Sequence, residues 1–331
     1  MWELTEEEAV LAQKLASGEP TIRKRALRLM DKWVKEASTS HKFNEESMEA
    51  LCKGLYYGMW MQDKMIVQEE LADFFGSLIN HFEKELDSVL YIKSFFVVIS
   101  DEWSRMDRWR MDKFLMLVRR LVRALFGRLK KQQWPVLSCQ LYLEMFKTTV
   151  ISEGTACPDG LKFHFASVYL DELDNAGGLS VEQVNDFLLP YAELLTKKLI
   201  TDYLFDSVLD EIFISILHVF KEEFLKRQAK GEHNSDVMET EEVGLKFDYG
   251  AIVKMLRKVA KNREINSSRR RRFKLAAAGK YPFEVPVVSS RKAARERMKE
   301  EFDKALSRLL KNQKKIKGSK ATKKTGKLSK K

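Results

Sequence analysis

The clearest structural signal in the chain lies at residues 107–131, which read DRWRMDKFLMLVRRLVRALFGRLKK. Apolar side chains recur there every three or four residues, which is the spacing of one face of an α-helix. They are Trp109, Phe114, Leu115, Leu117, Val118, Leu121, Val122 and Leu125. The stretch has no proline and only one glycine, so little in it interrupts a helix. We predict a long amphipathic helix whose apolar side, Trp109 included, packs against other helices.

The polar side of this helix is strongly basic. Between residues 105 and 131, ten cations oppose only Asp107 and Asp112. The cations are Arg105, Arg108, Arg110, Lys113, Arg119, Arg120, Arg123, Arg128, Lys130 and Lys131. Two interpretations stay open: a basic ridge that contacts RNA or an acidic partner, or an ordinary solvated face partly paired with acidic side chains of the body.

The same helical spacing extends in both directions along the chain. Thr5 and Glu8 fit a capping box at the start of a helix through Leu15. Further helices are predicted at 22–33, 44–59, 63–82, 86–100, 107–131, 134–151, 159–174, 180–198 and 201–227. Helices joined by short loops indicate an all-α fold, and we predict an α-solenoid of degenerate HEAT-like antiparallel helix pairs. A compact irregular helical bundle is the alternative.

Changes in composition divide the chain into four parts. Residues 1–227 form the predicted helical repeat domain, and 228–244 are a flexible acidic and polar linker. Residues 245–278 hold a short docking helix, from Asp248 to Lys261, and an arginine cluster. Residues 279–331 form a basic, partly disordered C-terminal tail, which includes a predicted basic helix.

Positive charge is concentrated near the C-terminus. Residues 251–331 contain 28 Lys or Arg and six Asp or Glu, whereas residues 1–250 contain 31 and 42, so the net charges are +22 and −11. Arginine forks match phosphate oxygens, and lysines add flexible point charges, so this arm is suited to RNA. The candidate RNA-binding residues are Arg269, Arg270, Arg271, Arg272, Lys311, Lys314, Lys315 and Lys317. The alternative is a nuclear import signal only.

Enzymatic motifs are missing from the sequence. There is no phosphate-binding GxxxxGK[ST] loop, no GxGxxG, no GxSxG and no HExxH, and the five histidines lack metal-ligand spacing. The three cysteines are far apart, which indicates a reducing compartment. No apolar run is long enough to span a membrane. We predict a non-catalytic protein with no cofactor, metal, small-molecule substrate or membrane partner; a nuclease is disfavoured because no carboxylate cluster has metal spacing.

A second unusual stretch joins two predicted helices and places an aromatic and a thioether beside polar groups. It consists of Trp60, Met61, Gln62, Asp63 and Lys64. In one interpretation Trp60 and Met61 belong to the core and Asp63 caps the following helix. In the other, the stretch is an exposed anchor for a protein partner.

Two motifs of this chain resemble a known family. The run Gly54–Lys64 (GLYYGMWMQDK), followed by Gln68–Leu71 (QEEL), and the run Glu102–Phe114 (EWSRMDRWRMDKF) are similar to the hallmarks of the ribosomal RNA-processing protein 1 family, the nucleolar 52-kilodalton protein family. Weaker similarity lies at 160–165, 187–190 and 247–249, and the resemblance covers roughly residues 5–275.

The resemblance implies a nucleolar assembly factor of early pre-60S particles, a scaffold that is needed to process pre-rRNA toward 5.8S and 25S/28S rRNA. It implies pre-rRNA and other large-subunit assembly factors as partners, and no catalytic residues. We assign its motif residues to partner binding or packing; they are Trp60, Met61, Gln62, Asp63, Lys64, Arg105, Arg108 and Lys113. The alternative is a HEAT-like nuclear adaptor or transport protein whose basic tail is only an import signal.

Overall fold

A computed structural model describes residues 6–40, 43–219, 244–262 and 265–277. The chain divides into two units, Met1–Lys280 and Tyr281–Lys331. All of the second unit lies outside the described residues, as do the predicted cap at Thr5, most of the linker at 228–244 and the basic tail. The boundaries of the four predicted parts therefore stay predictions, and the description that follows concerns the first unit.

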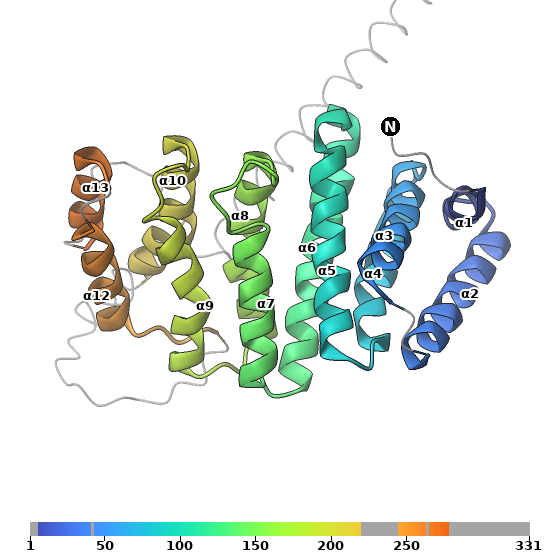
Figure 1. Ribbon diagram of the computed structural model, residues 1–331, viewed down its shortest axis with the longest axis horizontal. Coiled ribbons are helices and arrows are strands. Elements are labelled where there is room, and N and C mark those ends of the chain that lie inside the picture. Colours follow the sequence, from blue (N-terminus) through green and yellow to red (C-terminus); the bar gives the residue numbers. More distant parts are fainter. Residues whose placement is uncertain (1–5, 41–42, 220–243, 263–264, 278–331) are drawn as a thin grey trace, which may run out of the picture. The chain divides into compact units, whose positions relative to one another are not determined.

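Helices account for the regular structure of the described residues, which contain no strand (Figure 1). Three short turns of tighter or wider helix extend or link them: η1 (Leu78–His81), η2 (Trp103–Arg105) and η3 (Leu209–Ile214). The α-helices are α1 (Glu6–Leu15), α2 (Pro20–Thr39), α3 (Glu45–Trp60), α4 (Met65–Ser77), α5 (Glu85–Glu102), α6 (Arg108–Lys131), α7 (Val136–Thr148), α8 (Asp159–Ala176), α9 (Val181–Leu194), α10 (Asp202–Val208), α12 (Tyr249–Ala260) and α13 (Ser267–Ala277). The predicted all-α class is confirmed.

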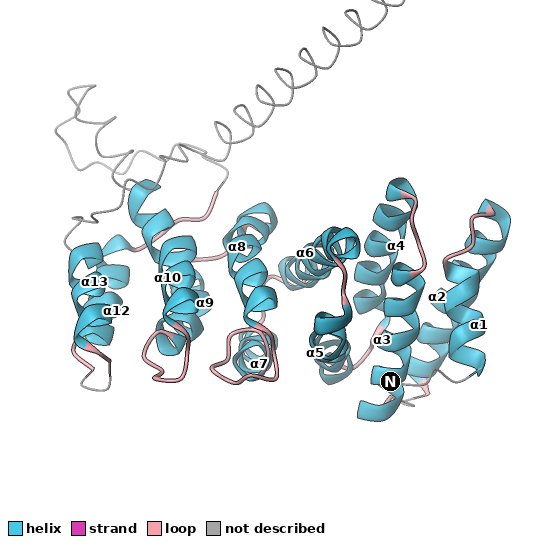
Figure 2. Ribbon diagram, turned by 90° about the horizontal axis from the view of Figure 1, so that it is seen from above, coloured by secondary structure: helices cyan, strands magenta, loops and turns pink. Residues whose placement is uncertain are grey.

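The helices form two layers of a repeat. In one layer α1, α3, α5, α7, α9 and α12 pack on one another in that order, and in the other α4, α6, α8 and α10 do the same. Figure 2 shows the two layers on opposite sides of one row of helix pairs. From α3 to α9 each helix therefore contacts its counterpart in the next pair, which is the arrangement of a helical repeat. This result decides for the repeat fold over the irregular bundle.

The core runs along the row between the layers, and α6 is its longest contributor. Phe114, Val118 and Leu125 of α6 are fully buried, as the helical spacing of 107–131 predicts. The ring of Phe114 stacks on that of Tyr56 in α3, with 4.4 Å between centroids. At Gly76 in α4 a side chain would come within 3.1 Å of the Arg120 carbonyl oxygen, so this glycine permits the close approach of α4 and α6.

Local signals in the sequence explain where several helices begin and end. Asn44 and Ser180 each form a capping box, in which the side chain accepts a hydrogen bond from the backbone three residues later. After α8, Gly177 and Gly178 both have positive φ, so the chain reverses at glycines that tolerate this backbone conformation.

Most helix positions agree with the sequence, with a few differences in extent. The expected helix over 180–198 ends at Leu194, and that over 63–82 is α4 followed by the η1 turn. α13, which contains the arginine cluster, is a helix that the sequence pattern did not indicate. Within the described part of the chain, no helix has the length and apolarity that crossing a bilayer requires.

Candidate functional site

The connection between α3 and α4 holds the end of the first family motif. Lys113 of α6 binds the backbone of this connection. The Lys113 side chain is buried, and its Nζ donates to the Trp60 carbonyl oxygen at 2.7 Å and to the Gln62 carbonyl oxygen at 2.8 Å. Burial lowers the pKa of Lys113. The two family motifs, 54–64 and 102–114, thus meet in space, and Lys113 joins them.

Gln62 is the second buried polar residue of this connection. Its Nε2 donates to the Ala16 carbonyl oxygen at 3.0 Å, and its Oε1 accepts from the backbone N–H of Lys64 at 2.9 Å. The prediction that Asp63 caps α4 is wrong, because Lys64 occupies the cap position and no side chain caps this helix. The Gln62 amide instead connects this loop to the end of α1, since it binds the Ala16 carbonyl group and a backbone N–H of the loop itself.

Around this buried junction lies an exposed apolar surface. Trp109 is 91% exposed, Ile66 83% and Met65 72%, and Met61 is also exposed. The prediction that Trp109 packs inward is wrong, and Met65 and Ile66 were missed as surface residues. Large apolar side chains that are exposed together are a feature of surfaces that bind other proteins. We name Met61, Met65, Ile66 and Trp109 the junction surface.

The charged motif residues are placed at the edge of the junction. The Arg110 guanidinium lies 4.6 Å from the centroid of the Trp60 ring, which is half-buried, and its side chain also pairs with Asp107. Arg105 is exposed and donates to buried Glu102 at 2.8 Å. Arg108, like Asp63 and Lys64, is exposed. In the two family motifs, Gln62 and Lys113 are thus buried and serve packing, whereas Arg105 and Arg108 are exposed.

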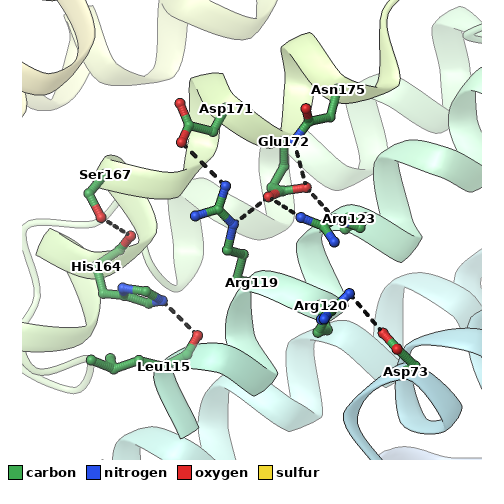
Figure 3. A network of polar contacts seen from close by, with 10 residues as sticks. All are labelled: Asp73, Leu115, Arg119, Arg120, Arg123, His164, Ser167, Asp171, Glu172 and Asn175. Atoms are coloured by element: carbon green, nitrogen blue, oxygen red, sulfur yellow. Dashed lines mark hydrogen bonds and ion pairs between the residues drawn. The ribbon is translucent and has the colours of Figure 1, made fainter. Parts of the chain in front are cut away.

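Farther along α6 the basic side is bound to acidic groups of neighbouring helices (Figure 3). Arg119 Nε donates to Glu172 of α8 at 2.5 Å, and Arg123 Nε donates to the same carboxylate at 2.7 Å. On the opposite side Arg120 pairs with Asp73 of α4 at 3.2 Å. Six of the ten cations of 105–131 pair with a carboxylate of the protein, and Lys113 binds two backbone carbonyl oxygens. These contacts favour the interpretation of a face paired with the acids of the body.

Glu172 is the centre of this network. Its side chain is buried, and burial acts to raise the pKa of its carboxyl group, but hydrogen bonds from Arg123 and Arg119 outweigh this and hold the pKa below its usual range. Two turns earlier in α8 the His164 ring nitrogen lies 2.7 Å from the Leu115 carbonyl oxygen (Figure 3). Burial lowers the pKa of His164, which favours the neutral ring. The network therefore links α6 to α8.

The arginine cluster is divided by the phase of α13. Arg269 is buried; it pairs with Asp202 at 2.6 Å and donates to the Ile200 carbonyl oxygen at 2.8 Å. Arg270 donates to the Ile265 carbonyl oxygen, and Arg272 pairs with Asp206. Arg271 is exposed. Three of the four predicted RNA-binding arginines thus make contacts within the protein, and Lys311, Lys314, Lys315 and Lys317 lie outside the described residues.

We expect Arg269→Ala to loosen α13, because it removes charge-assisted hydrogen bonds at a buried site and leaves two carbonyl groups unpaired, a loss of about 1–3 kcal/mol. Hydrogen exchange of the α13 amides measures this directly. The matched control is the neighbouring exposed Arg271→Ala, which should leave exchange unchanged. Equal exchange in both variants would contradict the assignment.

Comparison with known proteins identifies the family of this chain. The family model of the nucleolar protein Nop52 matches residues 6–276. A ribosomal RNA processing protein 1 homologue of Caenorhabditis elegans is 44% identical over 298 residues, which cover 87% of this chain and 73% of the nematode protein. The human homologue A is 30% identical over 226 residues, 65% of this chain and 49% of the human protein.

The Drosophila melanogaster homologue is 36% identical over 189 residues, 56% of this chain and 27% of the fly protein. The chain thus spans most of the nematode relative but a half or less of the human and fly relatives. The resemblance that the two motifs indicate is confirmed, and the match takes in the junction, the Glu172 network and nearly all of α13. The chain belongs to the Nop52 family of nucleolar proteins.

Proposed function

We propose that this chain is a non-catalytic scaffold in the nucleolar assembly of the large ribosomal subunit, needed to process pre-rRNA toward 5.8S and 25S/28S rRNA. The observation that carries the proposal is the family match over residues 6–276, together with relatives named for ribosomal RNA processing. The helical repeat supports it, since stacked helix pairs provide extended surfaces for several partners. Its proposed partners are pre-rRNA within pre-60S particles and other assembly factors.

The junction surface is the proposed contact with another assembly factor. Its exposed aromatic and aliphatic groups resemble the anchors on which protein interfaces depend, and buried Lys113 and Gln62 hold the backbone beneath them in one conformation. Exposed Arg105 and Arg108 lie at the start of the same helix region and give this surface a basic rim. The partner segment would therefore be apolar with acidic flanks.

The basic C-terminal region is the proposed contact with pre-rRNA. Residues 251–331 carry a net charge of +22, which suits them to a phosphodiester backbone. Lys311, Lys314, Lys315 and Lys317 of the tail keep their proposed role in binding RNA. We expect a smaller contribution to RNA binding from Arg269, Arg270 and Arg272, because their side chains already have partners in the protein.

Depletion of the protein from cells that express it tests the assignment to the large subunit. We expect 5.8S and 25S/28S rRNA to fall while 18S rRNA is maintained, and the tagged protein to sediment with pre-60S particles. A loss of 18S rRNA alone would refute the proposal. Replacement of residues 311–331 by an unrelated import signal separates scaffold from adaptor: we expect incomplete rescue, and full rescue would contradict a role of the tail beyond import.

A further inference from the structure

The last helix pair of the described residues has a large excess of positive charge. α12 and α13 pack against each other, and α12 also packs against α9. Between Tyr249 and Ala277 the sequence has ten Lys or Arg and a single carboxylate, Glu264. Residues 1–250, in contrast, have more acidic than basic side chains. This folded pair therefore places concentrated positive charge on an acidic body.

Four exposed cations form one stripe along α12. They are Lys254, Arg257, Lys258 and Lys261. Their spacing of three, four and seven residues places them on the same side of the helix, over about 10 Å of its length. Ile252, Leu256 and Val259 follow the same spacing on the opposite side and are buried. The stripe is thus directed away from the core.

α13 adds two more exposed cations, Arg271 and Lys274, which are three residues apart. Its buried side carries Arg269, Phe273 and Ala276, and the Phe273 ring packs edge-on against Phe205 of α10 at 5.2 Å. The contacts that hold α13 in place are therefore made by its buried side. Arg271 and Lys274 take no part in them and are exposed. We name these six exposed residues of α12 and α13 the terminal cationic face.

Among the residues that the structure describes, the terminal cationic face has neither ionic partners nor apolar anchors. Within the part of the chain that the structure describes, none of its six cations forms an ion pair, whereas most cations of α6 do. The large apolar side chains that are exposed on other helices have no counterpart among the described side chains of α12 and α13. Protein interfaces have aromatic or aliphatic groups at their centre and few lysines. A purely cationic face fits a polyanion better.

Two structural explanations account for only part of the pattern. Cations in the last turn of a helix interact favourably with its dipole, which applies to Arg257 and Lys258 but not to Lys254, one turn earlier. The last repeat of a stack needs a polar outer side for solubility, but polar residues of either sign would serve. Neither reason explains why every charge on this face is positive.

We propose that the terminal cationic face binds the sugar-phosphate backbone of RNA and so extends the RNA contact from the tail onto folded helices. The inference rests on the proposed function for the choice of RNA as the polyanion. A stripe of cations with short, fixed spacing binds phosphates through charge and counterion release, so affinity should depend on salt and little on base sequence. Because the stripe is held on a helix, binding requires less ordering of the backbone than it does in an unfolded polybasic segment.

The test uses the full chain and a single-stranded RNA of mixed sequence, with binding measured by fluorescence anisotropy over a range of salt concentrations. The variant is K254Q/R257Q/K258Q/K261Q. The matched control, K24Q/R25Q/R28Q/K32Q, removes the same charge from exposed positions of α2. Circular dichroism and thermal unfolding should show both variants folded, because all eight side chains are exposed.

For the α12 variant we expect roughly tenfold or greater loss of affinity near 0.1 M salt, and a salt slope smaller in magnitude by about 3, since each lost phosphate contact on a single strand removes about 0.7. The α2 control should retain affinity and slope within a factor of about two. Equal losses in the two variants would show a general charge effect and overturn the proposal. The proposal would also be overturned if the α12 variant bound RNA as the wild type does but lost binding to poly-glutamate. That result would assign the face to an acidic protein.

Failure here is distinguishable from failure of the proposed function. If the α12 variant binds RNA normally while depletion still blocks 5.8S and 25S/28S maturation, the large-subunit role stands and only this face is excluded. If depletion leaves the large-subunit rRNAs intact, the proposed function fails whatever the binding measurement shows.

Discussion

Replacing Lys113 with alanine is expected to lower the free energy of unfolding by about 2–3 kcal/mol, among the largest effects of any single polar substitution in this protein. The Lys113 ammonium group binds the carbonyl oxygens of Trp60 and Gln62 at 2.7 and 2.8 Å, at a site closed to solvent. Its removal leaves both carbonyl groups without this donor, and the α3–α4 connection loses its link to α6. Chemical denaturation measures the loss.

Two further variants separate hydrogen bonding from packing at this site. Lys113→Met keeps the apolar stem but has no donor, so it should lose most of the same stability. Lys130→Ala removes an exposed cation from the other end of α6 and should change the unfolding free energy by less than about 0.5 kcal/mol. If Lys113→Met is as stable as the wild type, the junction is held by packing and our account of the motif is wrong.

Glu172→Gln should destabilise the protein by about 2–3 kcal/mol at neutral pH, because it leaves Arg119 and Arg123 without their shared carboxylate. The full cost of breaking a buried ion pair is larger, but these arginines are 35% and 44% exposed and water compensates in part. Thermal or urea unfolding of the two proteins gives the difference. Glu144→Gln, at an exposed pair with Lys147, is the control and should have little effect.

The effect of Glu172 should depend on pH with a definite sign. The pKa of this carboxyl group is lower in the folded than in the unfolded protein, so its contribution is fully present at neutral pH and falls as the pH drops below about 4. The stability difference between wild type and Glu172→Gln should therefore shrink in acid. A difference that stays constant from pH 7 to about pH 3 would contradict the ionised pair.

Periodicity predicted the helices because burial of one helical side is a local property of the sequence. The apolar positions of 107–131 show it: Phe114, Val118 and Leu125 are all buried. Trp109 belongs to the same pattern and is nevertheless exposed. Periodicity tells which side of a helix faces its neighbours, but it does not tell where along the helix those neighbours end.

The roles of polar residues were harder to predict, because their partners lie far away in the sequence. Gln62 binds a carbonyl oxygen 46 residues earlier, and Lys113 binds one 53 residues earlier. No local pattern contains that information. The family resemblance identified both residues as conspicuous and left open whether they pack or bind, and the coordinates assign both to packing.

Composition alone was misleading for the arginine cluster. Four successive arginines appear equivalent in the sequence, yet the helical phase of α13 directs Arg269 into the protein and Arg271 into solvent. The cations of α12, which are spread over a helix and are less conspicuous in the sequence, form the more continuous surface. Charge density indicates a candidate region for RNA binding, and only the helix geometry distinguishes side chains that hold the fold from those that a ligand can reach.

The most direct test of the central claim is a map of ultraviolet crosslinks between the full-length protein and RNA in cells. The account predicts crosslinks to precursors of the large-subunit rRNAs, and on the protein side within residues 249–277 and 279–331. Crosslinks confined to small-subunit precursors, or found only on the helices that precede α12, would contradict it.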